Sequence, residues 1–212
     1  MKGDFGDSVK LGKNPSLGEY VLLGVASEKE KVGKLIIGDN AIIRSHSVIY
    51  AGTRIGNNLR TGHGVLIREK NTIGHNVSIG SHSVIEAESS IGNNVRIHSS
   101  CFIPEFVIIE DGAWIGPRVT ILNVLHPPCP RFADCAKSVH IKQNAKIGGN
   151  VTLGPRVTIG RNSLIGMGSV VTTDIPDDVL AFGNPARVIR KISELTCELG
   201  YFKIPYEWDK LK

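Results

Sequence analysis

Two features are missing from the sequence: a long apolar run and a cluster of basic residues. No apolar stretch approaches the ~20 residues that a membrane-spanning helix needs, and the start, MKGDFGDSVK, lacks the apolar region of a secretory signal. We therefore expect a cytoplasmic protein with no membrane partner. The net charge of +5 would suit an anionic ligand, but the lysines and arginines are dispersed along the 212 residues. Dispersed charge of this kind does not favour nucleic-acid binding.

Cysteine is also scarce, with four residues in the whole chain. Three of them, Cys129, Cys135 and Cys197, lie outside the repeat described below. In a reducing compartment, so few thiols do not indicate a disulfide framework. Two hypotheses remain: free thiols, or a metal site that uses Cys129 and Cys135 with His126, because thiolates and imidazole are zinc ligands. The loose spacing favours free thiols and no bound metal.

What the sequence does contain is an apolar residue at every sixth position. From Ile37 to Ile115 every sixth residue is Ile, except Thr61, and a mostly small or β-branched residue follows four positions later. This spacing fits neither a helix nor an open antiparallel sheet. Short parallel strands wound as a solenoid satisfy it, with both sets of residues pointing inward. The length is that of one domain.

The tetrapeptides IGDN, IGNN, IGHN and IGNN, which begin at residues 37, 55, 73 and 91, recur every 18 residues. Three six-residue units per coil predict a triangular prism. Gly and Asn tolerate a left-handed backbone, so we place these tetrapeptides at a tight corner. Leu11, Leu17 and Leu23 indicate an opening coil, and the charged stretch SEKEKVGK after it an exposed loop.

The repeat is interrupted by NVLHPPCPRFADCAKSVH, residues 123–140, and resumes at Ile141. A solenoid side cannot absorb this insertion, so it must leave the prism at a corner as a loop. Such loops on a rigid scaffold often carry function. The loop could instead hold a neighbouring subunit in an oligomer. The functional role and this structural role are compatible with each other.

This repeat resembles that of the hexapeptide-repeat acyltransferases, over residues 11–190. The resemblance implies an all-β fold, a left-handed parallel β-helix, and a homotrimer that holds acyl-CoA between subunits. On this basis residues 1–188 form the β-helix domain with an extruded loop at 124–140. Residues 189–212 form a C-terminal helix and tail, because Ile189, Ile192, Leu195 and Leu199 have helical spacing.

The loop resembles those of two subgroups. In sugar and xenobiotic O-acetyltransferases, a His followed by Pro is the general base, which implies that role for His126. In nucleotide-linked amino-sugar N-acetyltransferases, the pattern EDxxxxGPxxxxxN ends in an Asn that contacts the acceptor amine. The residues that match this pattern are Glu110, Asp111, Gly116, Pro117 and Asn123.

Further candidates for substrate contact are Glu105, one coil below Asn123, and His98, one coil before the acidic pair. Corner packing is the alternative role for Asn123 and for the other histidines. A zinc site of the parallel-β-helix carbonic anhydrase type is disfavoured, since Ala87 stands where that family has a ligand.

The segments GMGSVVTTDIP and GNPARVI resemble the CoA-binding end of the same acetyltransferases. The resemblance implies cofactor contacts, to the pantetheine arm, the adenine and the phosphates in turn, at Gly149, Gly166, Met167, Thr172, Thr173, Arg187 and Arg190. The family often has Lys in place of Thr173. The alternative is that small residues end the last coil and the two arginines form a solvated face.

The chemistry distinguishes the two acceptors. A hydroxyl needs a positioned base, and imidazole has a suitable pKa, whereas a neutral amine is already nucleophilic. We therefore expect acetyl-CoA-dependent transfer to the amine of a nucleotide-linked amino sugar in surface polysaccharide biosynthesis, with Asn123 and His126 as catalytic residues. The alternatives are O-acetylation of a sugar or small alcohol with His126 as base, and a non-catalytic β-helix scaffold.

Overall fold

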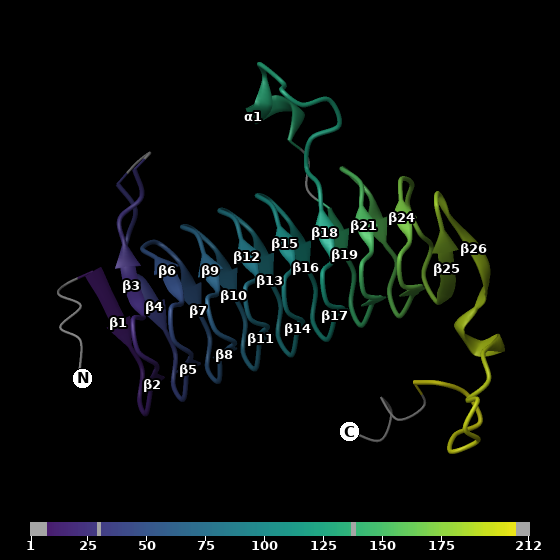
Figure 1. The fold of residues 1–212 in the computed structure, drawn as a ribbon, viewed down its shortest axis with the longest axis horizontal. Helices are drawn as coiled ribbons and strands as arrows, with labels where there is room; N and C mark the ends of the chain where they lie inside the picture. The colour runs from purple at the N-terminus through teal and green to yellow at the C-terminus, as the bar shows by residue number, and fades with distance from the viewer. Residues whose placement is uncertain (1–7, 29–30, 137–138, 207–212) are drawn as a thin grey trace.

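The computed structural model shows a long prism of stacked coils with a loop projecting from one side (Figure 1). It describes residues 8–28, 31–136 and 139–206. Outside the described residues lie 1–7, the start of the predicted β-helix domain, and 207–212, the end of the predicted C-terminal tail. So do residues 29–30 of the predicted charged loop and residues 137–138 of the predicted extruded loop. No helix in the described part of the chain is long and apolar enough to cross a membrane.

Three sheets form the sides of the prism, and successive strands pass from one sheet to the next. Sheet A contains β1 (Val9–Leu11), β4 (Leu35–Ile37), β7 (Arg54–Ile55), β10 (Thr72–Ile73), β13 (Ser90–Ile91), β16 (Ile108–Ile109), β19 (His140–Ile141) and β22 (Thr158–Ile159). Sheet B contains β2 (Ser16–Leu17), β5 (Ile42–Ile43), β8 (Arg60–Thr61), β11 (Ser78–Ile79), β14 (Arg96–Ile97), β17 (Trp114–Ile115), β20 (Lys146–Ile147), β23 (Leu164–Ile165), β25 (Val179–Gly183) and β26 (Ala186–Lys191). Sheet C contains β3 (Leu22–Val25), β6 (Val48–Tyr50), β9 (Leu66–Ile67), β12 (Val84–Ile85), β15 (Phe102–Ile103), β18 (Thr120–Ile121), β21 (Thr152–Leu153) and β24 (Val170–Val171).

The register of the parallel strands confirms the predicted 18-residue coil. In sheet A, Ile73 pairs with Ile55 on one side and with Ile91 on the other. The same residue of each coil therefore lies above its equivalent in the coil before.

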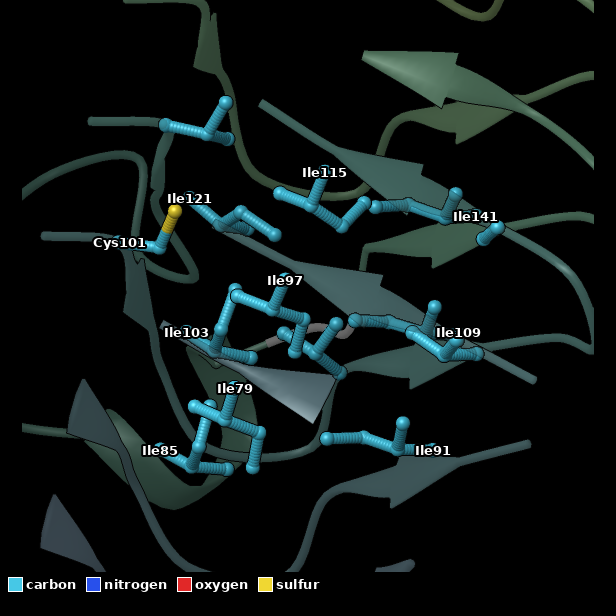
Figure 2. Packing of buried hydrophobic residues seen from close by; sticks show 14 of the residues in the cluster. Ile79, Ile85, Ile91, Ile97, Cys101, Ile103, Ile109, Ile115, Ile121 and Ile141 are labelled. Atoms are coloured by element: carbon cyan, nitrogen blue, oxygen red, sulfur yellow. The ribbon is translucent and has the colours of Figure 1, made fainter. Parts of the chain in front are cut away.

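The core is a set of isoleucine columns. Figure 2 shows Ile79, Ile97 and Ile115 one above another, with parallel columns from the other two sheets. All the predicted inward positions from 37 to 115 are buried, Thr61 included. Burial of each such side chain contributes about 1.5–3 kcal/mol, so a repeated Ile on every side stabilises the stack along its whole length.

The prediction gave Asn and Gly the same role at the corners, a left-handed backbone, but in the structure the two residue types have different roles. Asn40, Asn58 and Asn76 do adopt the left-handed conformation. Asn40 Nδ2 donates to Asn58 Oδ1 at 3.2 Å, and Asn58 Nδ2 donates to Asn76 Oδ1 at 2.7 Å. Gly56, however, has an ordinary φ, and a Cβ there would lie 2.8 Å from the carbonyl carbon of Gly74 in the next coil. Glycine follows Ile here because the coils approach closely.

The predicted opening coil is confirmed, because β1, β2 and β3 pair with the coil that follows them.

The charged loop after β3 is anchored on buried Glu69: Ser27 Oγ donates to Glu69 Oε1 at 3.1 Å. The guanidinium of Arg68 donates to both oxygens of the same carboxylate, at 2.9 and 3.1 Å.

The predicted loop leaves the prism between β18 and β19 (top of Figure 1) and contains one short helix, α1 (Phe132–Cys135). The coils close beneath it as if it were absent, since β16 still pairs with β19 and β18 with β21.

The predicted C-terminal helix from residue 189 is wrong. Residues up to Lys191 belong to strand β26, which runs antiparallel to β25, and only a short 3-10 helix, η2 (Ile192–Glu194), follows. The last strand of the prism has unpaired backbone N–H and C=O groups, and an antiparallel strand can satisfy them whereas a helix cannot. The tail then returns along sheet B, where Lys146 Nζ lies 4.4 Å from the centre of the Tyr206 ring.

Candidate functional site

The two ends of the extruded loop are each held by a carboxylate from the coil below. At the exit, Asn123 Nδ2 donates to Glu105 Oε2 at 3.0 Å. At the return, His140 Nε2 lies 2.6 Å from Glu110 Oε1, and the Gln143 backbone N–H donates to Glu110 Oε2 at 2.9 Å. The structure therefore places Glu105 beside Asn123, one coil below it as predicted, and uses both carboxylates to fix the base of the loop.

His126 lies on this loop with its side chain exposed. The loop emerges at the corner between sheets C and A and projects away from the prism (Figure 1). An exposed imidazole on a projecting loop can reach groups beyond its own coil, which suits a base that acts on a substrate held elsewhere.

The two loop cysteines lie together, with Sγ of Cys129 2.6 Å from Sγ of Cys135, and both thiols are free. The described residues include no group of three or more His, Cys, Asp or Glu side chains that could hold a metal ion.

Asp111 lies at the corner between sheets A and B and has a structural partner. It accepts a hydrogen bond from the Asn93 backbone N–H at 2.6 Å. Pockets lie on both sides of it. One, of about 360 Å³, is lined by Ser90, Ile108 and Glu110. The other, of about 850 Å³, is lined by residues that include Arg96, Trp114, Lys146 and Tyr206.

His98 lies on sheet B, away from the loop. Its ring centre is 4.7 Å from that of Trp114. Burial, with a smaller effect from the Arg96 guanidinium, lowers the pKa of His98. In the described part of the chain its Nε2 atom is buried without a hydrogen-bond partner. The ring is therefore neutral near pH 7.

The predicted cofactor residues fall on three parts of the final coils. Gly149 and Met167 lie at the corner between sheets B and C, 18 residues apart, and Met167 is 84% exposed. Thr172 and Thr173 are exposed at the corner between sheets C and A, where the loop also leaves. Arg187 and Arg190 are exposed on β26, opposite Phe182 and Leu180.

Gly166 has a packing role, because a Cβ there would lie 2.7 Å from Cβ of Phe182. Gly168, in contrast, has φ of +71° and open space around it. Open space therefore surrounds Gly168, whereas Gly166 packs against the next strand, β25.

Sequence reasoning missed the partnership of His140 with Glu110 and took His140 only as the end of the insertion. A signal was present, since His140 precedes the inward Ile141 and so faces outward above Ile108. Placing the return of the chain in register would have predicted the contact.

Comparison with known proteins finds similarity to several acetyltransferases. Residues 138–173 match the family "Bacterial transferase hexapeptide (six repeats)". The chain is 45% identical to the galactoside O-acetyltransferase of Lactococcus lactis over 92 residues, which is 42% of this chain and 44% of that protein. It spans less than half the length of the curated relatives that it matches.

Two solved structures are similar. The maltose O-acetyltransferase of Clostridium difficile 630 is 33% identical, with a TM-score of 0.50, over 57% of this chain and 69% of that one. The hexapeptide-repeat acetyltransferase of Vibrio cholerae is 28% identical, with a TM-score of 0.50, over 56% and 72%. With three parallel sheets, six-residue units and these relatives, the chain belongs to the hexapeptide-repeat acyltransferase family of left-handed parallel β-helices.

Proposed function

We propose that this protein transfers an acetyl group from acetyl-CoA to a sugar hydroxyl, with His126 as the general base. The observation that carries the proposal is an exposed His-Pro on a loop that a β-helix extrudes at one corner. The names of two relatives, a galactoside and a maltose O-acetyltransferase, support a sugar as acceptor.

In this reaction the imidazole of His126 takes the hydroxyl proton as the oxygen attacks the thioester carbonyl. A backbone N–H of an adjacent coil would stabilise the oxyanion that forms. The carbon–sulfur bond then breaks, and the CoA thiolate recovers the proton from the imidazolium. General base catalysis of this kind contributes about 10²–10⁴-fold to the rate.

Acetyl-CoA would lie along the final coils. Gly149 and Met167 would face the pantetheine arm, Thr172 and Thr173 the adenine, and the two arginines of β26 the phosphates. The loop and the corner that carries Gly149 lie at different edges of the prism. A homotrimer, in which the loop of one copy meets that corner of the next, would bring His126 to the thioester. Acetyl-CoA as donor agrees with the cytoplasmic location expected from the sequence.

A second acceptor is favoured by the base of the loop. Asn123 is held against Glu105, and Glu110 and Asp111 follow the pattern of enzymes that acetylate nucleotide-linked amino sugars. With an amine acceptor, Asn123 would orient the nitrogen and His126 would contact the substrate. The product would enter surface polysaccharide biosynthesis.

The test is acetyl-CoA consumption over a panel of free sugars and nucleotide-linked amino sugars, with wild type, His126→Ala and His63→Ala. His63 is an exposed imidazole on a corner and serves as the matched control. We expect His126→Ala to lower transfer to a hydroxyl by about 10²–10⁴-fold while sparing most transfer to an amine. Unchanged rates with both acceptors would remove His126 from the mechanism.

Cofactor binding is tested separately from turnover. At 100 times its Kd, acetyl-CoA should stabilise the folded protein by about 2.7 kcal/mol and raise its melting temperature. No shift at saturating acetyl-CoA, together with no turnover on any acceptor, would favour the scaffold hypothesis.

A further inference from the structure

The extruded loop holds two thiols in contact. The sulfur atoms of Cys129 and Cys135 are 2.6 Å apart, closer than the van der Waals contact of two unbonded sulfurs, and both side chains are partly accessible. The other two cysteines are elsewhere: Cys101 is buried in the core, where its Sγ donates to the Gly116 carbonyl at 3.1 Å, and Cys197 lies in the tail.

The local fold is what brings the pair together. Helix α1 turns the chain back after Arg131, whose carbonyl accepts hydrogen bonds from the backbone N–H groups of Asp134 and Cys135, both at 3.0 Å. The Arg131 guanidinium also pairs with the Asp134 carboxylate at 2.8 Å. These contacts within the loop place Cys135 beside Cys129.

We infer that Cys129 and Cys135 form a reversible disulfide by exchange with a low-molecular-weight disulfide such as oxidised glutathione. A pair of thiols already in contact can close with little movement of the backbone. Two cysteines whose side chains are far apart or point apart cannot be bridged unless the backbone moves, and the contact of these two sulfurs meets that condition.

The exchange balances in two steps. The Cys129 thiolate attacks one sulfur of the small disulfide, which forms a mixed disulfide and releases one small thiolate. The Cys135 thiolate then attacks Sγ of Cys129 and releases the second. Two electrons pass from the cysteines to the small disulfide, and the two cysteine protons end on the two small thiols. Interaction with Cys129 and, after it, desolvation raise the pKa of Cys135, which disfavours the Cys135 thiolate as the attacking group in the first step.

A regulatory consequence rests on the proposed function. Cys129 is three residues from His126, and a closed ring over residues 129–135 removes backbone rotations next to that imidazole. We expect oxidation to lower acetyl transfer several-fold and reduction to restore it.

The test uses a Cys197→Ser protein, which leaves the pair and the buried Cys101, exposed to oxidised glutathione. Trypsin cuts the denatured chain after Arg118, Arg131 and Lys137, and therefore separates the two cysteines. Peptides 119–131 and 132–137 should be joined before reduction and separate after it. Cys135→Ser is the matched control and should stop at a glutathione adduct on Cys129.

The inference is overturned if both cysteines carry glutathione, or if both stay reduced, in the Cys197→Ser protein. An unchanged rate in the oxidised protein would refute the regulatory consequence alone. The peptide linkage is read independently of turnover. A protein that forms the linkage but never consumes acetyl-CoA would count against the proposed function and leave the disulfide established.

Discussion

The hydrogen bond from Asn123 to Glu105 offers a direct test of whether the base of the loop controls the chemistry. Asn123 is the first residue of the insertion, and Glu105 lies in the coil below at the same corner. Substituting Asn123 by Ala removes the amide and leaves the carboxylate in place. If this bond keeps the loop docked, its loss raises the population of undocked loop and moves His126 from its working position.

The magnitude follows from the type and burial of the bond. Hydrogen bonds to charged groups contribute about 1.5–3 kcal/mol. Both side chains here are only partly buried, so the lower end applies. A change of ~1.4 kcal/mol is tenfold in an equilibrium constant. We therefore expect kcat/KM for a hydroxyl acceptor to fall by up to about tenfold in Asn123→Ala. Transfer to an amine, which does not need His126 as a base, should fall little.

The assay is a double-mutant cycle with Glu105→Gln, read both by acetyl transfer and by native-state trypsin cleavage after Arg131. Both single variants should speed cleavage of the loop, and the double variant should be little worse than either. Additive effects would show that the two side chains act separately. A loss confined to amine acceptors, with no change in cleavage, would instead assign Asn123 to the acceptor.

Two further predictions concern the scaffold. Burial alone would raise the pKa of Glu69, but hydrogen bonds from Arg68 and Ser27 lower it below its ordinary 4.5. The ionised carboxylate therefore stabilises the fold above that pH and loses this effect as pH falls. Thermal melts should show Glu69→Gln destabilised by about 1–3 kcal/mol at pH 7 and equal to wild type in acid; a constant difference would exclude the linkage. Gly56→Ala should cost about 1–3 kcal/mol through overpacking against the next coil. Gly33→Ala, which meets no atom within 4 Å, should be neutral, and similar urea midpoints for the two would contradict the close-approach argument.

The prism could be predicted because its inward positions repeat in sequence and in space with the same period. Thr61 did not disturb the phase, since a single substitution within a long Ile series leaves the neighbouring columns intact. The points where the chain leaves the prism and re-enters it could also be predicted. The six-residue period stops after Ile121, where the loop begins, and restarts at Ile141.

The parts that could not be predicted depend on contacts between coils or on the end of the stack. The apolar spacing at Ile189, Ile192 and Leu195 fits a helix, but the unpaired edge of β25 determines a strand instead. The Gly that follows Ile in tetrapeptides such as IGNN was correctly placed at a corner, yet the cause of its selection, the approach of the next coil, has no signal within one repeat.

At the candidate site, the sequence indicated which coil lies beneath which, and so placed Glu105 under Asn123. It could not show that the two cysteines of the loop meet each other, because one turn of helix between them, and not a repeat, sets that distance.

The closure of the coils beneath the loop has a practical consequence. β16 pairs with β19 across the insertion without a register shift. The strand pairing of the prism therefore does not depend on the length of the loop inserted before β19. Loops of other lengths and sequences can be exchanged at this corner while the columns of isoleucine stay aligned. The prism is in this sense a rigid scaffold, and the loop is the part that can be exchanged. If the loop sets substrate preference, grafting the segment that follows Asn123 should transfer that preference between relatives.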